Sequence, residues 1–262
     1  MLRVGVIGHG AIGKALVAAL DEGRAGAARC PAVLVATPRE GGDARITADP
    51  DAFFAEPMDA VVECAGHPAV AAHGERVLAA GADLVITAVG ALTDDALADR
   101  LEAAAVRSGR RVILPSAGIG ALDMLSAAAV GGLDRVRVTV RKDPSAWVGT
   151  VAEERFDLAG MTGPTTLYEG PVREGARLYP GNVNISAAAA LAGLGLDRTE
   201  LRIVADPALD THVVEIEAEG AFGRLRFEED VTISENRKTG RIVAMALIKT
   251  VRNLSAPVVV GW

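Results

Sequence analysis

Apolar runs alternate with amphipathic segments along the first 120 residues. The runs are nearly continuous in Val, Ile, Leu and Ala, which is typical of strands buried on both faces of a parallel sheet. The intervening segments carry apolar residues at helical spacing, as helices that cover such a sheet must. The pattern predicts strands over 2–7, 32–37, 59–66, 83–89 and 111–118, and helices over 11–23, 68–81 and 94–109. We therefore predict an α/β fold with a doubly wound parallel sheet.

The pattern changes in the second half of the chain. Valine alternates with charged residues and threonine over 135–141, which predicts a half-exposed antiparallel strand. Two further alternating runs flank "EGAFG" at 219–223 and predict a hairpin. Helices are predicted over 121–133, 169–178 and 184–196. This mixture of elements indicates a second domain of the α+β class.

The stretch "VGVIGHGAIGKAL" at 4–16 places three glycines directly after a predicted strand and at the start of a predicted helix. This G-x-G-x-x-G context is that of a dinucleotide-binding turn. Gly8 permits the tight turn, Gly10 lets the backbone approach a pyrophosphate, and Gly13 allows close packing of helix on strand. A tight turn that binds nothing is the alternative. The residues expected at the cofactor phosphates are Gly8, Gly10, Ala11, Ile12 and Gly13, at a helix N-terminus with free N–H groups.

These signals divide the chain into three parts. We predict a Rossmann-type dinucleotide-binding domain over 1–120 and an α+β catalytic, substrate and oligomerisation domain over 121–235. The amphipathic helix within 236–262 is expected to return to the Rossmann domain.

The choice between NAD and NADP depends on the residues after the second predicted strand. An Asp or Glu there normally binds the adenosine ribose hydroxyls, but the sequence reads "ATPRE", which places Thr37 and Arg39 at that position. An arginine suits a 2′-phosphate, whereas Glu40 could still serve NAD, and Arg39 could be a solvated loop charge. We expect dual use of NAD and NADP. Ala65, at the carboxyl edge of the third predicted strand, is expected to line the same site.

Composition narrows the classes of partner and compartment. The chain has 27 basic and 34 acidic residues, so no broad positive field favours nucleic acid or an anionic membrane. Cys30 and Cys64 are too few for a disulfide framework or a paired zinc motif, so we expect free thiols and no metal site. No stretch reads as a leader or a membrane span. We expect a cytoplasmic protein.

His212 lies in "DTHVVEIEAE", on the same face as Val214 and Ile216, and is therefore expected to point inward. A buried imidazole can act as an acid or base near physiological pH. A core histidine with satisfied ring nitrogens fits the pattern equally well. Asp206 and Asp210 precede it and could orient the imidazole or cap turns.

Anionic groups of a substrate need local cations. The candidates in the second half are Arg141, Lys142, Arg173, Arg177, Lys238 and Arg241, and the pattern does not choose among them. Asn182 and Asn184 in "YPGNVNIS" carry amides that could bind a carboxamide or carboxylate. Asn184 is also a natural N-cap for the helix that follows.

Six separated motifs have a common order: "VGVIGHGAIG", "AVGAL", "LPSAGIGALD", "LYPGNVNISAAAALAGLGLDRT", "ADPALDTHVVEIE" and "ENRKTGRI". Along essentially its whole length the sequence resembles the L-aspartate dehydrogenase family, and "PGNVN" followed by "THVVEIE" is the specific part. The resemblance implies a dimeric enzyme that oxidises L-aspartate to iminoaspartate with NAD or NADP. The imine then yields oxaloacetate and ammonia or feeds NAD biosynthesis, and the reverse reaction is reductive amination.

The resemblance also implies roles for particular residues. His212 matches the family's active-site histidine, and Asn182 matches the asparagine on the nicotinamide side. A stretch that usually reads S-G-A-I-G is S-A-G-I-G here, so Ala117 and Gly118 are both expected at the cofactor. Asn184 and Lys238 are the expected substrate-binding residues.

Two alternatives stay open. The first is another Rossmann-type dehydrogenase or imine reductase, acting on a different amino acid, a semialdehyde or a cyclic imine. The second is a non-catalytic NAD(P)-binding sensor. A substrate panel separates the first from an aspartate enzyme, and tight cofactor binding without turnover would indicate the second.

Overall fold

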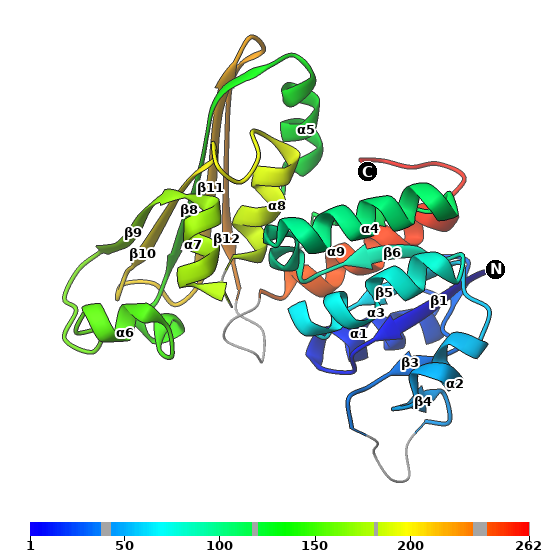
Figure 1. Ribbon diagram of the computed structural model, residues 1–262. Helices are drawn as coiled ribbons and strands as arrows, with labels where there is room; N and C mark the ends of the chain where they lie inside the picture. The colour runs from blue at the N-terminus through cyan, green and yellow to red at the C-terminus, as the bar shows by residue number, and fades with distance from the viewer. Residues whose placement is uncertain (38–42, 117–119, 181–182, 233–239, 262) are drawn as a thin grey trace. The chain divides into compact units, whose positions relative to one another are not determined.

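The computed structural model describes residues 1–37, 43–116, 120–180, 183–232 and 240–261. The chain divides into two compact units (Figure 1). The first unit contains Met1–Ala117 together with Val243–Trp262, and the second contains Gly118–Ile242. The C-terminal segment thus belongs to the same unit as the N-terminus.

The first unit is built on a parallel sheet with the strand order β4-β3-β1-β5-β6-β7, and β2 also pairs with β1 (Figure 1). The strands are β1 (Leu2–Ile7), β2 (Ala28–Arg29), β3 (Val33–Leu34), β4 (Ile46–Thr47), β5 (Ala60–Glu63), β6 (Asp83–Ile86) and β7 (Val112–Ile113). The order reverses between β1 and β5, and open α/β sheets bind ligands outside the carboxyl ends of the strands at such a point. The doubly wound fold class is confirmed.

Helices cover both faces of this sheet. They are α1 (Ala11–Asp21), α2 (Pro50–Ala55), α3 (His67–Ala79), α4 (Asp95–Ser108) and α9 (Ile242–Ser255), with a 3-10 turn η1 (Val89–Thr93) before α4. Val61 lies in the core formed with α3 and α4, whereas its neighbour Val62 lies in the core formed with α1 and α9. Adjacent strand residues point to opposite faces, so both faces of β5 are buried. Leu247 and Val251 of α9 are fully buried in the second of these cores.

Several strands are shorter than the apolar runs that predict them. The run 59–66 forms a strand only over Ala60–Glu63. The N–H group of Cys64 still donates to Ile7, but those of Ala65 and Gly66 donate to the Glu63 side chain instead of a neighbouring strand. Hydrophobic residues therefore predict which positions are buried. The end of the strand is set by the point at which its backbone N–H groups no longer bond to a neighbouring strand.

The second unit contains a mixed sheet with the order β12-β11-β8-β10-β9 (Figure 1). Its elements are α5 (Leu122–Val130), β8 (Leu133–Lys142), η2 (Pro144–Trp147), α6 (Val151–Arg155), β9 (Thr165–Pro171), α7 (Val172–Leu178), α8 (Asn184–Ala192), β10 (Glu200–Ala205), β11 (His212–Gly220) and β12 (Gly223–Val231). The predicted hairpin is confirmed, because β11 and β12 pair antiparallel up to Gly220 and Gly223. The antiparallel prediction for β8 holds only on one side, since β8 is antiparallel to β11 but parallel to β10.

The two faces of this sheet differ in chemistry. Val136, Val138 and Val140 are buried, and Val136 lies with Leu125 of α5 near Gly193, the residue after α8. Figure 1 shows α5, α7 and α8 beside this sheet. The other face carries ion pairs such as Arg135 with Glu200 and Arg226 with Glu215. In the part of the chain that the structure describes, no helix is long and apolar enough to cross a membrane.

Candidate active site

The glycine-rich turn joins β1 to α1 at the switch point of the first sheet. Gly8 has φ +99°, and a Cβ there would lie 2.8 Å from backbone atoms of Cys64. A Cβ at Gly13 would lie 2.0 Å from the carbonyl oxygen of Gly8. At Gly10, by contrast, no heavy atom lies within 4 Å of the Cβ position. Packing therefore requires two of the glycines, while the third leaves open space beside the turn.

The open space lies at the N-terminus of α1. The first helical hydrogen bond runs from the Lys14 N–H to the Gly10 carbonyl, at 2.9 Å. The N–H groups of Ala11, Ile12 and Gly13 precede that bond and have no acceptor within the helix. Such N–H groups and the helix dipole favour a phosphate. The open space at Gly10 leaves room for the backbone to approach a dinucleotide pyrophosphate, and that role of the turn stays a prediction.

A buried carboxylate that the sequence reasoning missed organises the same edge of the sheet. Glu63, the last residue of β5, is 1% exposed. One of its oxygens, Oε1, accepts hydrogen bonds from the N–H groups of Ala65 and Gly66, both at 2.6 Å, and Oε2 accepts from Ala88 at 3.0 Å. It thereby fixes the loops that follow β5 and β6. A single carboxylate at the end of an apolar run is the signal that could have revealed it.

The other predicted cofactor residues lie in different parts of the structure. Ala65 is exposed, and its Cβ lies 2.9 Å from the position of a Cβ on Gly8, so the structure brings these two residues together. Thr37 is exposed after β3. Five predicted cofactor or substrate residues lie outside the described residues: Arg39, Ala117, Gly118, Asn182 and Lys238.

Both cysteines of the first unit are free, as predicted. Burial raises the pKa of the Cys30 thiol to about 11. Burial, with a smaller contribution from the Glu63 carboxylate, raises the pKa of the Cys64 thiol far above its usual range. Neither thiol is a thiolate at neutral pH, so neither serves as a nucleophile.

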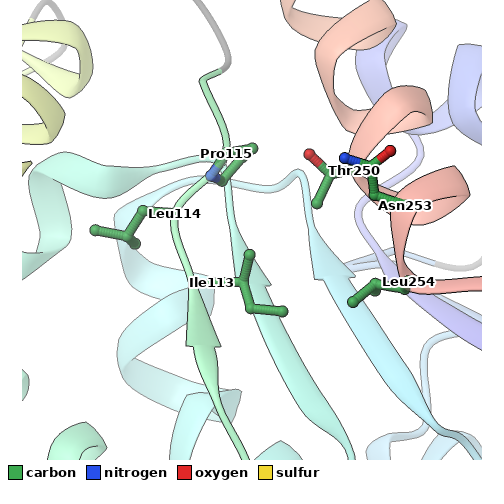
Figure 2. Close-up of a pocket in the computed structure, with 6 residues that line it drawn as sticks. All are labelled: Ile113, Leu114, Pro115, Thr250, Asn253 and Leu254. Atoms are coloured by element: carbon green, nitrogen blue, oxygen red, sulfur yellow. The ribbon is translucent and has the colours of Figure 1, made fainter. Parts of the chain in front are cut away.

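A small pocket lies between the carboxyl end of β7 and α9 (Figure 2). Its lining residues are Ile113, Leu114, Pro115, Thr250, Asn253 and Leu254. The Thr250 hydroxyl donates to the Ala246 carbonyl, and the Asn253 amide donates to the Gly261 carbonyl. Because both polar side chains are used internally, we interpret the pocket as a packing gap.

Three buried polar residues meet at one edge of the second sheet. Lys142 ends β8, Asp206 follows β10 and His212 begins β11, and they are 2%, 7% and 4% exposed. Val213 pairs with Arg141, so the next position of the antiparallel ladder places His212 opposite Lys142. Residues opposite each other in this way have Cβ atoms about 4.5–5.5 Å apart. The inward orientation expected for His212 is confirmed by its burial.

Asp206 acts as a turn cap. Its N–H group donates to the Lys142 carbonyl at 2.9 Å, which continues the pairing of β10 with β8. Its side-chain Oδ1 accepts from the Ala208 N–H at 3.0 Å, and its carbonyl accepts from the Leu209 N–H at 3.2 Å. These contacts fix the start of the segment that leads to His212.

The candidate cations that the structure describes differ in burial and in their partners. Arg173 pairs with Asp197 at 2.6 Å, and Arg177 and Arg241 are exposed. Arg141 precedes Lys142 in β8 and therefore points to the opposite face. Among the described lysines and arginines, Lys142 is the buried one.

The capping prediction for Asn184 is wrong. Val183 occupies the N-cap position of α8, and Asn184 is the first helical residue. Among the described residues no group of three His, Cys, Asp or Glu side chains could hold a metal ion.

A glycine turn at the switch point of a parallel sheet, with a second domain whose sheet edge carries a buried histidine, defines a class of protein. The class is that of two-domain dehydrogenases that use a nicotinamide cofactor. Residues 8–115 match the family described as "Homoserine dehydrogenase, NAD binding domain", and residues 123–254 match "Aspartate dehydrogenase, C-terminal".

Relatives identify the family within that class. The chain is 40% identical over 259 residues to an L-aspartate dehydrogenase of Cupriavidus necator and 40% identical over 264 residues to one of Pseudomonas aeruginosa, and each alignment covers 97% of both chains. It is also similar to a crystal structure of aspartate dehydrogenase from Thermotoga maritima, with a TM-score of 0.78 and 26% identity over 100% of both chains. The chain belongs to the L-aspartate dehydrogenase family.

Proposed function

We propose that the protein oxidises L-aspartate to iminoaspartate with NAD or NADP, and that it catalyses the reverse reductive amination. The observation that carries this proposal is the buried His212 at the edge of the second sheet, in a chain whose relatives at 40% identity are named L-aspartate dehydrogenases. The open cradle at Gly10 supports the cofactor half of the proposal.

The chemistry requires a proton acceptor as well as the cofactor. When bound, NAD(P) supplies the hydride acceptor. The substrate amine is protonated near neutral pH and must lose a proton before the carbon–nitrogen double bond forms. We assign that proton to His212 Nε2 or Nδ1, or assign the same imidazole to the water that hydrolyses the imine to oxaloacetate and ammonia. Either role predicts faster oxidation at alkaline pH.

The cofactor, the assembly and the compartment are part of the same proposal. Thr37 and Arg39 support acceptance of NADP, and Glu40 supports NAD, so we propose dual use. Gly8, Gly10, Ala11, Ile12, Gly13 and Ala65 would hold the dinucleotide in the first unit, with Ala117, Gly118 and Asn182 on the nicotinamide side. We also propose a homodimer, and the free thiols of Cys30 and Cys64 support the cytoplasm.

The test is an initial-rate assay at the absorbance band of the reduced nicotinamide. L-Aspartate with NAD or NADP is assayed at alkaline pH, and oxaloacetate with ammonia is assayed in reverse. His212→Ala should lose at least about 100-fold in kcat, the low end of the contribution of a general acid or base, and should keep its affinity for NADH. His73→Ala, in a helix of the first unit, is the control. Turnover of a different amino acid, or cofactor binding without turnover, would replace the proposal by one of the two alternatives.

A further inference from the structure

Lys142 is a cation held inside the second unit. The residue is 2% exposed, and its Nζ lies 5.3 Å from the centroid of the Trp147 ring. A cation over an indole face is attracted by the negative face of the ring. Lysine is rarely buried in proteins, because removing an ammonium from water is costly. A buried ammonium at this position is therefore a candidate for a role that uses its positive charge.

Two further buried side chains with polar atoms, those of His212 and Trp147, lie near Lys142. The ladder of β8 and β11 runs as far as Arg141 and Val213, and its continuation by one residue places Lys142 opposite His212, on the face that carries the buried valines (the covered face). Trp147 is fully buried and packs edge-to-face on Tyr179 at 5.9 Å. The buried Trp147 Nε1 has no hydrogen-bond acceptor among the described residues. A buried indole N–H normally finds one, so the Trp147 N–H remains available to a bound acceptor.

We propose that Lys142 binds a carboxylate of the substrate beside His212, and that it makes the enzyme selective for dicarboxylic substrates. This inference rests on the proposed function. A carboxylate accepts from an ammonium and from a neutral N–H group at the same time, which matches the donors of Lys142 and Trp147. The protein as a whole is acidic, with a net charge of −7. Affinity for an anionic substrate therefore has to come from a local cation.

Two variants at neighbouring positions test the proposal. Lys142→Met removes the charge from the covered face, and Arg141→Met removes a charge from the opposite face of the same strand. Loss of a charged hydrogen bond should raise the KM for L-aspartate by about 10- to 100-fold in Lys142→Met. The affinity for NADH, measured by fluorescence, should stay unchanged, and Arg141→Met should keep the KM of the parent. An unchanged KM in folded Lys142→Met would overturn the proposal.

A second readout does not depend on turnover. Succinate carries two carboxylates and no amine, so it should raise the melting temperature of the parent protein and of Arg141→Met but not that of Lys142→Met. If the parent fails to turn over L-aspartate but is stabilised by succinate through Lys142, the proposed function fails and the site stands. If succinate stabilises Lys142→Met as well as the parent, the site fails.

The conservative variant separates binding from packing. Lys142→Arg keeps the charge, so it should recover most of the succinate stabilisation and stay within about tenfold of the parent KM, whereas Lys142→Gln should behave as Lys142→Met. If the Met variant does not fold, the comparison of Arg with Gln decides. Equal KM values for those two variants would show that the charge does not bind substrate.

Discussion

Glu63→Gln tests whether Glu63 shapes the cofactor site in addition to stabilising the first unit. Its effect on the affinity for NADH can be compared with its effect on the melting temperature. The side chain keeps its size but loses its charge, and one acceptor oxygen becomes an NH2 group. In the parent, Glu63 accepts from Ala65 and Gly66 through one oxygen and from Ala88 through the other. If the amide oxygen keeps the first two donors, the new NH2 group faces the N–H of Ala88, donor against donor.

The cost can be worked from these three bonds. Hydrogen bonds to a charged group contribute about 1.5–3 kcal/mol and neutral ones about 0.5–1.5 kcal/mol. Two bonds that lose their charge and one that is lost altogether sum to about 3.5–6 kcal/mol. For a protein of this size that is a fall in the melting temperature of roughly 10–20 °C. The loop at Cys64 and Ala65 also packs against Gly8, so the phosphate cradle shifts with it. The affinity for NADH should fall roughly 10- to 100-fold, the loss expected when one hydrogen bond to a charged phosphate is broken.

Asp83→Asn is the matched control. Asp83 is another buried carboxylate of the same sheet, 7% exposed, but it lies at the amino end of β6 and accepts from Arg111. Both variants should unfold at lower temperature or urea concentration, and only Glu63→Gln should bind NADH more weakly at a temperature where both are folded. Equal NADH affinity in the two variants would refute the assignment of Glu63 to the cradle.

Three further predictions concern residues of the first unit. Gly10→Ala should keep the parent melting temperature and lose affinity for NADH in a fluorescence titration, whereas Gly13→Ala should lose both, because its Cβ would lie 2.0 Å from the Gly8 carbonyl oxygen. The Arg3 guanidinium lowers the pKa of the Asp59 carboxyl to about 2. This pair is partly exposed, so it should contribute about 1 kcal/mol above pH 4 that is lost as the pH falls from about 4 to 2, and urea unfolding of Asp59→Asn should lack that loss. The Cys64 thiol should react with an alkylating reagent much more slowly in the folded protein than after urea unfolds it, because its raised pKa lowers the fraction of thiolate.

The sequence pattern predicted the features that depend only on residues close together in the chain. The hairpin of β11 and β12 follows from two alternating runs and a short glycine-containing connection, all within one stretch of chain. The glycine turn followed from its position between a strand and a helix. The parallel pairing of β8 with β10 did not, because both strands alternate in the same way whichever neighbour they have. Pairing direction depends on the path of the chain between strands and not on the residues within them.

The role of Glu63 shows a second kind of limit. Its sequence context, an apolar strand followed by "CAG", indicates a strand end but not which backbone groups turn toward the carboxylate. One of those groups, the N–H of Ala88, belongs to the loop after β6 and comes close only because β5 and β6 are neighbours in the sheet. A buried charge can be suspected from sequence, whereas its partners require the fold.

The residues proposed to bind substrate include one feature that the sequence pattern predicts and one contact that only the fold reveals. Periodicity predicted that His212 points inward, and the same alternation applied to β8 puts Lys142 and Arg141 on opposite faces. Neither fact brings Lys142 and His212 together, because they are far apart in the sequence. Their adjacency comes from the register of β8 with β11, in which a shift by one residue would place Arg141 opposite His212 and turn Lys142 outward. Register is fixed by burying Val136, Val138 and Val140 on the covered face. Among the five candidate cations that the structure describes, the packing of the core therefore places Lys142 on the covered face, and the chemistry at the sheet edge follows from hydrophobic burial in the middle of the strands.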